Sequence, residues 1–520
     1  MITGTRMFDL QRHIPHPTRR GLANCALAVA LAAALAGCAV GPDFVKPTPV
    51  APDDWTSWRS AEDSLRALGA ADQPLPPHWW QAFNDPVLDN LTQRALVSSP
   101  DLQTAALHFA QARVQRSTTA AQRGPEVGVS GSANRQRQSE YGAGTRMIDA
   151  IGGDRESLVN VLSEPFTLYQ AGFDASWEVD LWGRVRRSIE AADADVDRQA
   201  ALLDLARLTL VSDVARNYFE LRTTQRQILL AREDITALED RLGILQARVD
   251  GGVIDHLNLE QQRAELAAIK AQLPGLLAQE GASANQIALL LGERPGALRE
   301  TLAAPPASDG TTALPDLALG LPSEAALRRP DIRAAEARLH RATASIGVAR
   351  ADLYPSIRLG ARFGYESYLS GEFSDWGSRA WSVGPSLNLP LFDGGRRRSV
   401  VQLRELEQQE AAVSYQQTVL QAWQEIDDAL SAYNAEQQQA QQLQARVRSA
   451  ADAYQLAQAR YDGGTADFIT VLDSQRSFLQ ARRDLTASQG RLNTRYVTIQ
   501  KVVGNAPQVE KPTAAATSGE

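Results

Sequence analysis

The sequence predicts an α+β fold made of two copies of one unit, each with a β-hairpin followed by a long helical hairpin. Residues 396–462 contain no proline and no glycine and are rich in good helix formers, which predicts a single helix about 100 Å long. A similar stretch occurs earlier in the chain at a constant offset. Short segments with alternating apolar and polar residues precede both stretches, which is typical of strands.

The duplication is clearest where the long helices end. Residues 460–467 repeat the pattern of residues 248–255 at an offset of 212, including the glycine pairs Gly251-Gly252 and Gly463-Gly464. Upstream the offset is 230, since Pro100 matches Pro330 and Pro125 matches Pro355. The change of offset places an 18-residue length difference between Pro125 and Gly183, where we expect a loop that tolerates insertion. Two such halves indicate one duplicated unit.

The first copy of the long helix is predicted over residues 184–249. Its apolar residues recur every seven positions, as expected for a seam that faces a neighbouring helix along a left-handed supercoil. They are Val214, Leu221, Ile228, Ile235, Leu242 and Val249. The glycine pairs permit the chain to reverse, and a second helix is predicted from Phe468 to about Val503.

The N-terminus has the features of an export signal. Four arginines precede an apolar stretch, residues 22–35, that is too short to span a bilayer as a mature helix. The stretch ends in Leu35-Ala36-Gly37-Cys38, which resembles the lipobox of bacterial lipoproteins; a plain secretory signal with a chance cysteine is the alternative. We therefore expect residues 1–37 to be removed and Cys38 to carry an N-acyl group and an S-diacylglycerol group. The mature chain then has one cysteine and no intramolecular disulfide.

An extended arm and a helix are expected next. Residues 38–85 include a stretch rich in Pro, Asp and Trp, which favours an arm with little core of its own. Asp85 is placed to cap a helix that has Pro86 at its first position. This helix is predicted to reach about Gln122, with a possible break near Pro100.

Two β-hairpins are predicted, one in each half. Residues with apolar side chains alternate with polar residues or glycine around 127–133, 173–179, 357–363 and 381–389. The pattern fits either a transmembrane hairpin or a half-buried hairpin of a soluble protein. Four strands cannot close a barrel, and open edges are excluded from lipid, so spanning strands would require several chains. Two copies would supply eight strands and three copies twelve, and a conducting pore favours three or more.

Little in the sequence points to catalysis. The four lysines do not follow the glycines of a phosphate-binding loop, and the mature histidines lack metal-ligand spacing. The net charge of −8 argues against general nucleic-acid binding. We expect no enzyme activity, no metal and no cofactor beyond the lipid on Cys38. Arg396-Arg397-Arg398 lie where a strand is predicted to give way to a helix, either near membrane phosphates or simply solvated.

Several separated motifs occur in a fixed order along the chain. They are Trp177-Glu178-Val179-Asp180-Leu181-Trp182-Gly183-Arg184, Leu321-Pro322-Ser323-Glu324, Arg328-Arg329-Pro330-Asp331-Ile332, Ala335-Glu336-Ala337, Ile346-Gly347-Val348-Ala349-Arg350, Tyr354-Pro355-Ser356, Pro390-Leu391-Phe392-Asp393-Gly394-Gly395-Arg396 and Arg460-Tyr461-Asp462-Gly463-Gly464. These motifs resemble those of TolC-like outer-membrane efflux proteins, in particular the NodT-type lipoproteins. The resemblance covers residues 38 to about 505.

The resemblance implies a homotrimer with a twelve-stranded β-barrel in the outer membrane and a twelve-helix α-barrel crossing the periplasm. Its expected partners are a periplasmic membrane-fusion adaptor and an inner-membrane resistance-nodulation-division transporter. The implied function is passive conduction of small toxic compounds or drugs to the exterior. The chain would divide into a first repeat (86–300), an equatorial linker (301–322), a second repeat (323–505) and a disordered tail (506–520).

The resemblance also implies a periplasmic gate at the hairpin tips. Asp473 matches an aspartate that rings the constriction in the family, and Ile469 matches an apolar residue that narrows it. Three copies of Asp473 would favour cations. Thr470 stands where the family often has a second aspartate, which is a departure. Tyr461 and Asn258 match positions that tie neighbouring hairpins together in the closed state. On pattern alone, Asp473 could equally be a solvated helix charge and Ile469 a core residue.

Two alternatives remain at this stage. One is a duct of the same fold for protein secretion with an ABC transporter. The other is a periplasmic lipoprotein whose hairpins act as a spacer without a pore. The lipobox favours efflux over secretion, and the alternating strands argue against a spacer.

Overall fold

The protein is described by a computed structural model that covers residues 39–507 except 56, 66–74, 143–154, 253, 304–314, 316, 318 and 320. The signal peptide, Cys38, most of the predicted linker 301–322 and residues 508–520 of the predicted tail lie outside the described residues. The chain forms two compact units. Unit 1 contains the described residues of Met1–Phe44, Arg116–Ala192 and Ala342–Gln408, and unit 2 those of Val45–Gln115, Asp193–Arg341 and Gln409–Glu520.

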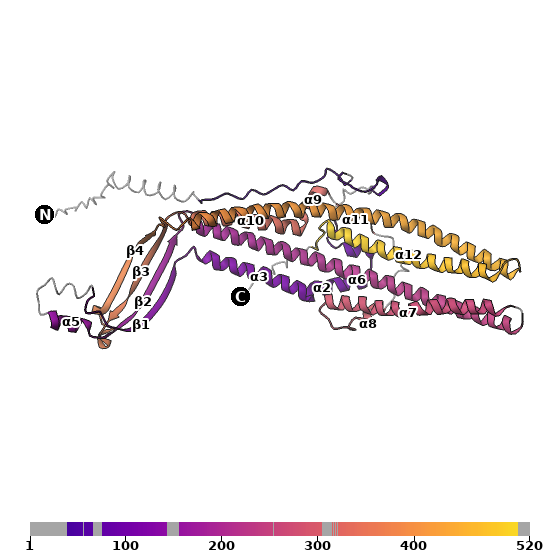
Figure 1. Ribbon diagram of the computed structural model, residues 1–520, viewed down its shortest axis with the longest axis horizontal. Helices are drawn as coiled ribbons and strands as arrows, with labels where there is room; N and C mark the ends of the chain where they lie inside the picture. Colours follow the sequence, from indigo (N-terminus) through magenta and orange to yellow (C-terminus); the bar gives the residue numbers. More distant parts are fainter. Residues whose placement is uncertain are drawn as a thin grey trace, which may run out of the picture. The chain divides into compact units, whose positions relative to one another are not determined.

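Unit 1 is built on one antiparallel sheet (Figure 1). Its strands are β1 (Glu126–Gln136), β2 (Phe166–Val179), β3 (Ser356–Ser367) and β4 (Arg379–Asn388), in the order β1-β2-β3-β4. Both predicted hairpins are confirmed, although β2 begins seven residues earlier than Phe173 and β4 ends before Leu389. Pairing of β2 with β3, which joins the hairpins into one sheet, was not predicted.

The two hairpins have equivalent registers. Val129 pairs with Phe173, and the residues related to them by the two sequence offsets, Leu359 and Pro385, also pair. The length difference between the repeats therefore lies in the turns, as predicted. The β1–β2 connection contains α5 (Arg155–Ser163), while the shorter β3–β4 connection contains η3 (Ser370–Glu372) and η4 (Trp376–Ser378).

One face of the sheet is apolar and exposed. Residues paired directly across neighbouring strands share a face, and Val129, Phe173, Phe363 and Trp381 form such a row. Their side chains are 75%, 58%, 45% and 69% exposed. The other face carries polar rows, such as Glu178, Arg358 and Ser386. Large apolar side chains exposed together mark a surface that contacts lipid or another chain.

The long helices match the predicted bounds closely. α6 (Arg184–Asp250) and α11 (Arg396–Asp462) each have 67 residues, and each is followed by a 35-residue partner, α7 (His256–Leu290) or α12 (Phe468–Val502). Glycine pairs end both long helices, so the equal lengths follow from the duplication.

Shorter helices also repeat. α2 (Pro86–Ser98) and α3 (Pro100–Ala121) correspond to α9 (Pro322–Arg328) and α10 (Pro330–Ala351), while α8 (Arg299–Ala303) follows α7. Asp85 caps α2 as predicted, because its carboxylate accepts hydrogen bonds from the backbone amides of Val87 and Leu88. The predicted break at Pro100 is confirmed, since proline disfavours helical geometry in the residue before it.

The main core of unit 2 contains a group of aromatic side chains among its aliphatic ones. Trp79, Trp80 and Phe83, in η2 (Trp79–Phe83), are buried together with Tyr218 of α6 and Tyr496 of α12. Residues before them run along α11: Arg59 and Ser60 bind Asp427, and the indole of Trp423 donates to the carbonyl of Val50. The N-terminal part of unit 2 is thus fastened by side chains of α11.

A buried carboxylate joins α11 to α12. Glu436 accepts hydrogen bonds from Ser488 Oγ at 2.5 Å and from Arg491 Nε and Nη2 at 2.9 and 3.0 Å. Burial acts to raise the pKa of Glu436, but the hydrogen bonds from Arg491 and Ser488 outweigh it, so the pKa lies below the ordinary glutamate value. A carboxylate of this kind stabilises the fold above its unfolded-state pKa, and the contribution is lost as pH falls through the folded-state pKa.

We expect Glu436→Gln to lower the free energy of unfolding at pH 7 by about 1–3 kcal/mol, because a charged hydrogen-bond acceptor is lost. The wild type should lose this advantage as the pH falls below about 4.3, the ordinary glutamate pKa. Chemical denaturation between pH 7 and pH 3 measures both effects. Glu410→Gln is the matched control, since this exposed glutamate forms a surface ion pair with Arg338. If the free energy of unfolding depended on pH equally in the wild type and in Glu436→Gln, the lowered pKa of Glu436 would be contradicted.

Candidate gate at the tips of the helical hairpins

Both hairpin tips turn on a glycine in the left-handed region. Gly252 has φ 69° and Gly464 has φ 72°, a conformation that residues with a β-carbon rarely adopt. In the second tip, the Thr465 amide donates to the carbonyl of Arg460 at 2.8 Å, which satisfies the end of α11. In the first tip, Asp255 caps α7 through the amide of Leu257. Gly251 and Gly463 precede these turn residues and are exposed.

One apolar cluster holds the two tips together. Its buried members come from α6, α7, α11 and α12, and they are Leu245, Leu259, Ala457, Phe468, Val471 and Leu472. Tyr461 packs against this cluster, with its ring 5.4 Å from that of Phe468. The arrangement fixes which face of α12 is turned away from the other hairpin.

The exposed face of α12 carries the three residues predicted to form the gate. Ile469 is 44% exposed, Thr470 is exposed, and the side chain of Asp473 is 68% exposed. Ile469 and Asp473 are four residues apart, so they lie on one side of the helix. The structure therefore places them together at the surface, while Phe468, Val471 and Leu472 face the cluster.

Tyr461 and Asn258, the predicted contacts between hairpins, each lie close to a hairpin tip. They form no hydrogen bond with each other. Asn258, in the first turn of α7, is half-buried. The hydroxyl of Tyr461 is buried, and among the described residues it has no hydrogen-bond partner, Asn258 included. The guanidinium of Arg248 lies 6.0 Å from the Tyr461 ring. In a single chain, Tyr461 is therefore held by packing.

Polar contacts between the hairpins flank the exposed face. Arg476 of α12 pairs with Glu265 of α7 at 2.6 Å, and it lies 3.9 Å from Asp473. Arg241 of α6 donates to Gln458 of α11 at 2.6 Å and to Gln475 of α12 at 3.2 Å. These pairs could not be predicted from the sequence, because their partners lie about two hundred residues apart; only the position of Arg476, one turn after Asp473, was a usable signal.

Two further ion pairs connect α12 with α6 at a greater distance along α12 from the tip. Arg482 of α12 pairs with Glu233 at 2.9 Å and with the buried Asp234 at 3.3 Å, both on α6. Burial raises the pKa of Asp234, although Arg482 and Arg483 act to lower it. The α6–α12 contact in this region therefore depends on arginine charge.

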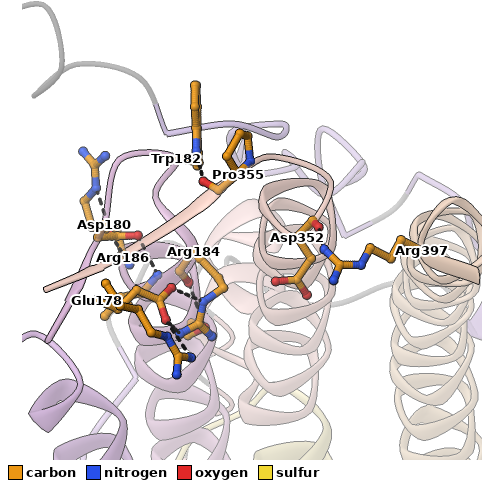
Figure 2. Close-up of polar contacts among 11 residues, drawn as sticks. Glu178, Asp180, Trp182, Arg184, Arg186, Asp352, Pro355 and Arg397 are labelled. Atoms are coloured by element: carbon orange, nitrogen blue, oxygen red, sulfur yellow. Dashed lines mark hydrogen bonds and ion pairs between the residues drawn. The ribbon is translucent and has the colours of Figure 1, made fainter. Parts of the chain in front are cut away.

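The motif around Trp182 shapes the turn from β2 into α6 (Figure 2). The Asp180 carboxylate accepts from the backbone amides of Val185 and Arg186 at 3.0 and 2.9 Å, which caps α6. Glu178 holds Arg184 through two hydrogen bonds of 2.7 and 2.9 Å. The Trp182 indole donates to the carbonyl of Pro355 at 2.8 Å and stacks on Tyr354.

The same turn in the second repeat uses Asp393. Its carboxylate accepts from the amides of Gly395 and Arg397 at the start of α11. The three arginines 396–398 do begin α11 just after β4, as the sequence indicated. These turns build structure and contain no arrangement typical of a catalytic centre.

In the part of the chain that the structure describes, no group of three or more His, Cys, Asp and Glu side chains is placed to hold a metal ion. Among the same residues, no helix is both long enough and apolar enough to cross a membrane.

Comparison with known proteins shows the family. The model of the outer membrane efflux protein family matches residues 91–293 and 321–505. The pyoverdine export outer membrane protein OpmQ of Pseudomonas putida is 34% identical over 85% of this chain and 91% of its own length. Nodulation protein T of Rhizobium leguminosarum is 28% identical over 93% of this chain and 94% of its own length.

A solved structure agrees with this result. The outer-membrane channel OprN has a TM-score of 0.79 and 31% identity, over 90% of this chain and 99% of that one. The predicted resemblance is thus confirmed. The chain belongs to the outer membrane efflux protein family, and it works in the outer membrane as the channel of an efflux pump.

Proposed function

We propose that three copies of this chain form the duct, with a twelve-stranded barrel in the outer membrane and a twelve-helix barrel in the periplasm. The strongest support is the sheet of unit 1. Within the described residues, β1 and β4 each pair on one side only, and the apolar face is exposed. Open edges are not tolerated in lipid, so β4 of one copy would pair with β1 of the next until the ring closes.

The duct would serve a tripartite pump. A periplasmic membrane-fusion adaptor and an inner-membrane resistance-nodulation-division transporter would complete it, and the cargo would be small toxic compounds or drugs. The export function named for OpmQ supports small-molecule cargo. The lipid on Cys38 would anchor each chain in the membrane.

In-cell crosslinking followed by mass spectrometry tests this assembly. We expect an adaptor and a resistance-nodulation-division transporter to be recovered with the full-length protein. Recovery of an ABC transporter with its adaptor would instead indicate protein secretion. Monomers without conductance in a reconstituted bilayer would support the non-conducting lipoprotein and would refute the duct.

The gate would lie at the exposed face of α12. In a trimer, three copies of Asp473 would ring the periplasmic opening, and Ile469 would narrow it beside Thr470. Tyr461 and Asn258 would meet partners on neighbouring hairpins in the closed state. The exposure of Ile469, Thr470 and Asp473, together with the lack of an intrachain partner for the Tyr461 hydroxyl among the described residues, supports contacts between copies.

Asp473→Asn should lower the preference for cations over anions. A cation about 4 Å from one carboxylate in water gains about 1 kcal/mol, so we expect roughly a fivefold fall in the permeability ratio. Reversal potentials in planar bilayers under a salt gradient measure it. Thr470→Asp should raise the ratio by adding a second ring of charge.

Asp250→Asn is the matched control for this prediction. Asp250 ends α6 at the other hairpin tip, and its carboxylate accepts from Gln246. We expect this variant to leave the permeability ratio unchanged. Equal effects of Asp473→Asn and Asp250→Asn would rule out a gate specific to α12.

A further inference from the structure

The two long helices differ in how far the same face is covered. On α11, Leu406, Val413 and Leu420 recur every seven residues, and their side chains are 54%, 63% and 69% exposed. The offset of 212 relates them to positions on α6 whose side chains are at most 2% exposed. These positions are Ala194, Ala201 and Leu208. A seam that the first repeat buries is therefore open to solvent in the second repeat.

α3 shows the same contrast with α10. Leu107 and Val114 of α3 are 61% and 67% exposed, whereas Ala337 and Ala344, which the offset of 230 relates to them, are 8% and 0% exposed. Of the 22 residues of α3, Ala112 alone is buried. Apolar side chains exposed along one side of a helix mark a surface that another molecule covers.

Within one chain, the buried seam of α6 faces α10. Two ion pairs of 3.0 and 3.1 Å join these helices: Asp204–Arg333 and Asp195–Arg341. Ala337 lies midway between the two arginines in sequence, and Ala201 lies between the two aspartates. A β-carbon on Gly347 of α10 would also come within 2.7 Å of the side chain of Arg187, which lies seven residues before Ala194 on the seam. The α6–α10 contact is thus an antiparallel apolar seam flanked by charges.

The charged positions of this contact are changed together in the other two helices. Gln103 of α3 stands where α10 has Arg333, and Gln416 of α11 stands where α6 has Asp204. Both glutamines are exposed. If only one charge had been replaced, the other would face an amide, whereas two amides can donate to and accept from each other. The paired replacement is expected if α3 and α11 face each other as α10 and α6 do.

A second copy of the chain is the molecule that fits both faces. The faces on α3 and α11 are both exposed within a single chain, so a chain does not cover its own seam. A contact between copies would join two unlike surfaces, and contacts of this kind close into rings. The sheet follows the same rule, since Ala175 of β2 pairs with Ala361 of β3. The two offsets then place Leu387 of one copy opposite Gly131 of the next.

We propose that α11 of one copy packs on α3 of the next copy in the register that α6 and α10 have within one chain. Leu107 then lies beside Val413, and Gln103 lies opposite Gln416. The inference rests on the proposed ring of three copies and names the helical surface that closes it. The seam within a chain is flanked by charge, while the seam between copies is uncharged and carries larger apolar residues. Because α3 offers no charged partner to Asp204, it competes poorly with α10 for α6.

Crosslinking of paired cysteines tests the register in the full-length protein in isolated outer membranes. With a bifunctional thiol reagent of short span, Leu107→Cys/Val413→Cys should give a ladder that ends at three copies. Coexpressed single variants, with one new cysteine in each chain, should stop at two copies, because the crosslink joins different chains. Each single variant alone should run as a monomer, which also controls for Cys38.

Leu107→Cys/Leu420→Cys is the matched control. Leu420 lies on the same seam as Val413 and is similarly exposed, but the shift of seven residues moves its thiol about 10 Å along the helix, beyond the span of the reagent. We expect no ladder from this variant. Native mass spectrometry of the same samples measures the trimer independently of the crosslink.

Three results would contradict the proposal. A trimer in which both cysteine pairs crosslink equally would overturn the register. A trimer in which neither pair crosslinks would overturn the α3–α11 contact and leave the duct standing, with a different protein covering the seam. Monomers in native mass spectrometry would overturn the proposed ring itself, and this inference with it.

Charge placement tests the two glutamines separately. Gln103→Asp/Gln416→Asp would bring two carboxylates together, so the trimer should dissociate at a lower temperature than the wild type. Gln103→Arg/Gln416→Asp rebuilds the ion pair of the α6–α10 contact and should dissociate near the wild-type temperature. Native electrophoresis after heating measures both. Equal dissociation temperatures for the two double variants would overturn the placement of Gln103 opposite Gln416.

Discussion

Gly490→Ala should lower the free energy of unfolding by about 2–3 kcal/mol, although alanine is the better helix former. Gly490 lies in α12 where it crosses α6. A β-carbon at this position would come within 2.1 Å of Thr223 Oγ1, 2.6 Å of Cγ2 and 2.9 Å of Cβ. Thr223 is β-branched and its hydroxyl donates to the Phe219 carbonyl, so it cannot turn aside. In this variant α6 and α12 must move apart, and the packing of the aromatic side chains in the core of unit 2 loosens.

Chemical denaturation of the single and double variants checks this result. Thr223→Ala removes the two closest atoms, so the double variant Gly490→Ala/Thr223→Ala should recover much of the loss, and the two changes should not add. Gly281→Ala is the control, because a β-carbon there meets nothing within 4 Å. This control should be neutral or stabilising by up to about 1 kcal/mol. Additive effects of Gly490→Ala and Thr223→Ala would contradict the close crossing.

Arg329→Leu should lower the free energy of unfolding by a similar amount, about 2–4 kcal/mol, because the carboxylates that Arg329 binds would lose their charged partner. Arg329 lies between α9 and α10 and is 6% exposed. Its guanidinium binds Asp331, Glu425 of α11 at 2.7 Å and the carbonyl of Val502 at 2.8 Å. Burial acts to lower the pKa of Arg329, but these carboxylates raise it, so the side chain stays charged.

The partners are partly exposed, which keeps the expected loss below that of a fully buried pair. Arg329→Lys keeps the charge but not the planar fork, so it should rescue only part of the stability. Arg338→Leu is the matched control, because its pair with Glu410 is exposed and should contribute at most about 1 kcal/mol. A stability loss in Arg338→Leu as large as in Arg329→Leu would exclude a specific role for Arg329. Thermal and chemical denaturation measure all three variants.

Local signals in the sequence were sufficient for most of the secondary structure. The ends of α6 and α11 could be placed because a Gly-Arg step precedes and a glycine pair follows each helix, and neither stretch contains proline. The faces of the sheet followed from alternation, and the length difference between hairpins followed from two offsets. Each of these signals lies within a few residues of the element it defines.

Local signals of this kind do not predict contacts between segments that are far apart in the sequence. Gly490 reads in the sequence only as a poor helix former, and its close approach to Thr223 becomes visible once α6 and α12 are packed. The β2–β3 pairing joins strands from different repeats. At the candidate gate, the resemblance supplied Asp473 and Ile469, whereas the pair of Arg476 with Glu265 required the structure.

The equivalent registers of the two hairpins have a practical consequence for inserting an epitope tag. Because the repeats differ in length only between paired strands, the β1–β2 turn has already accepted extra residues without moving a single strand pair. A short epitope placed there should leave the ladder beneath it unaltered. The matching turn of the second repeat offers a second, shorter insertion position on the same chain.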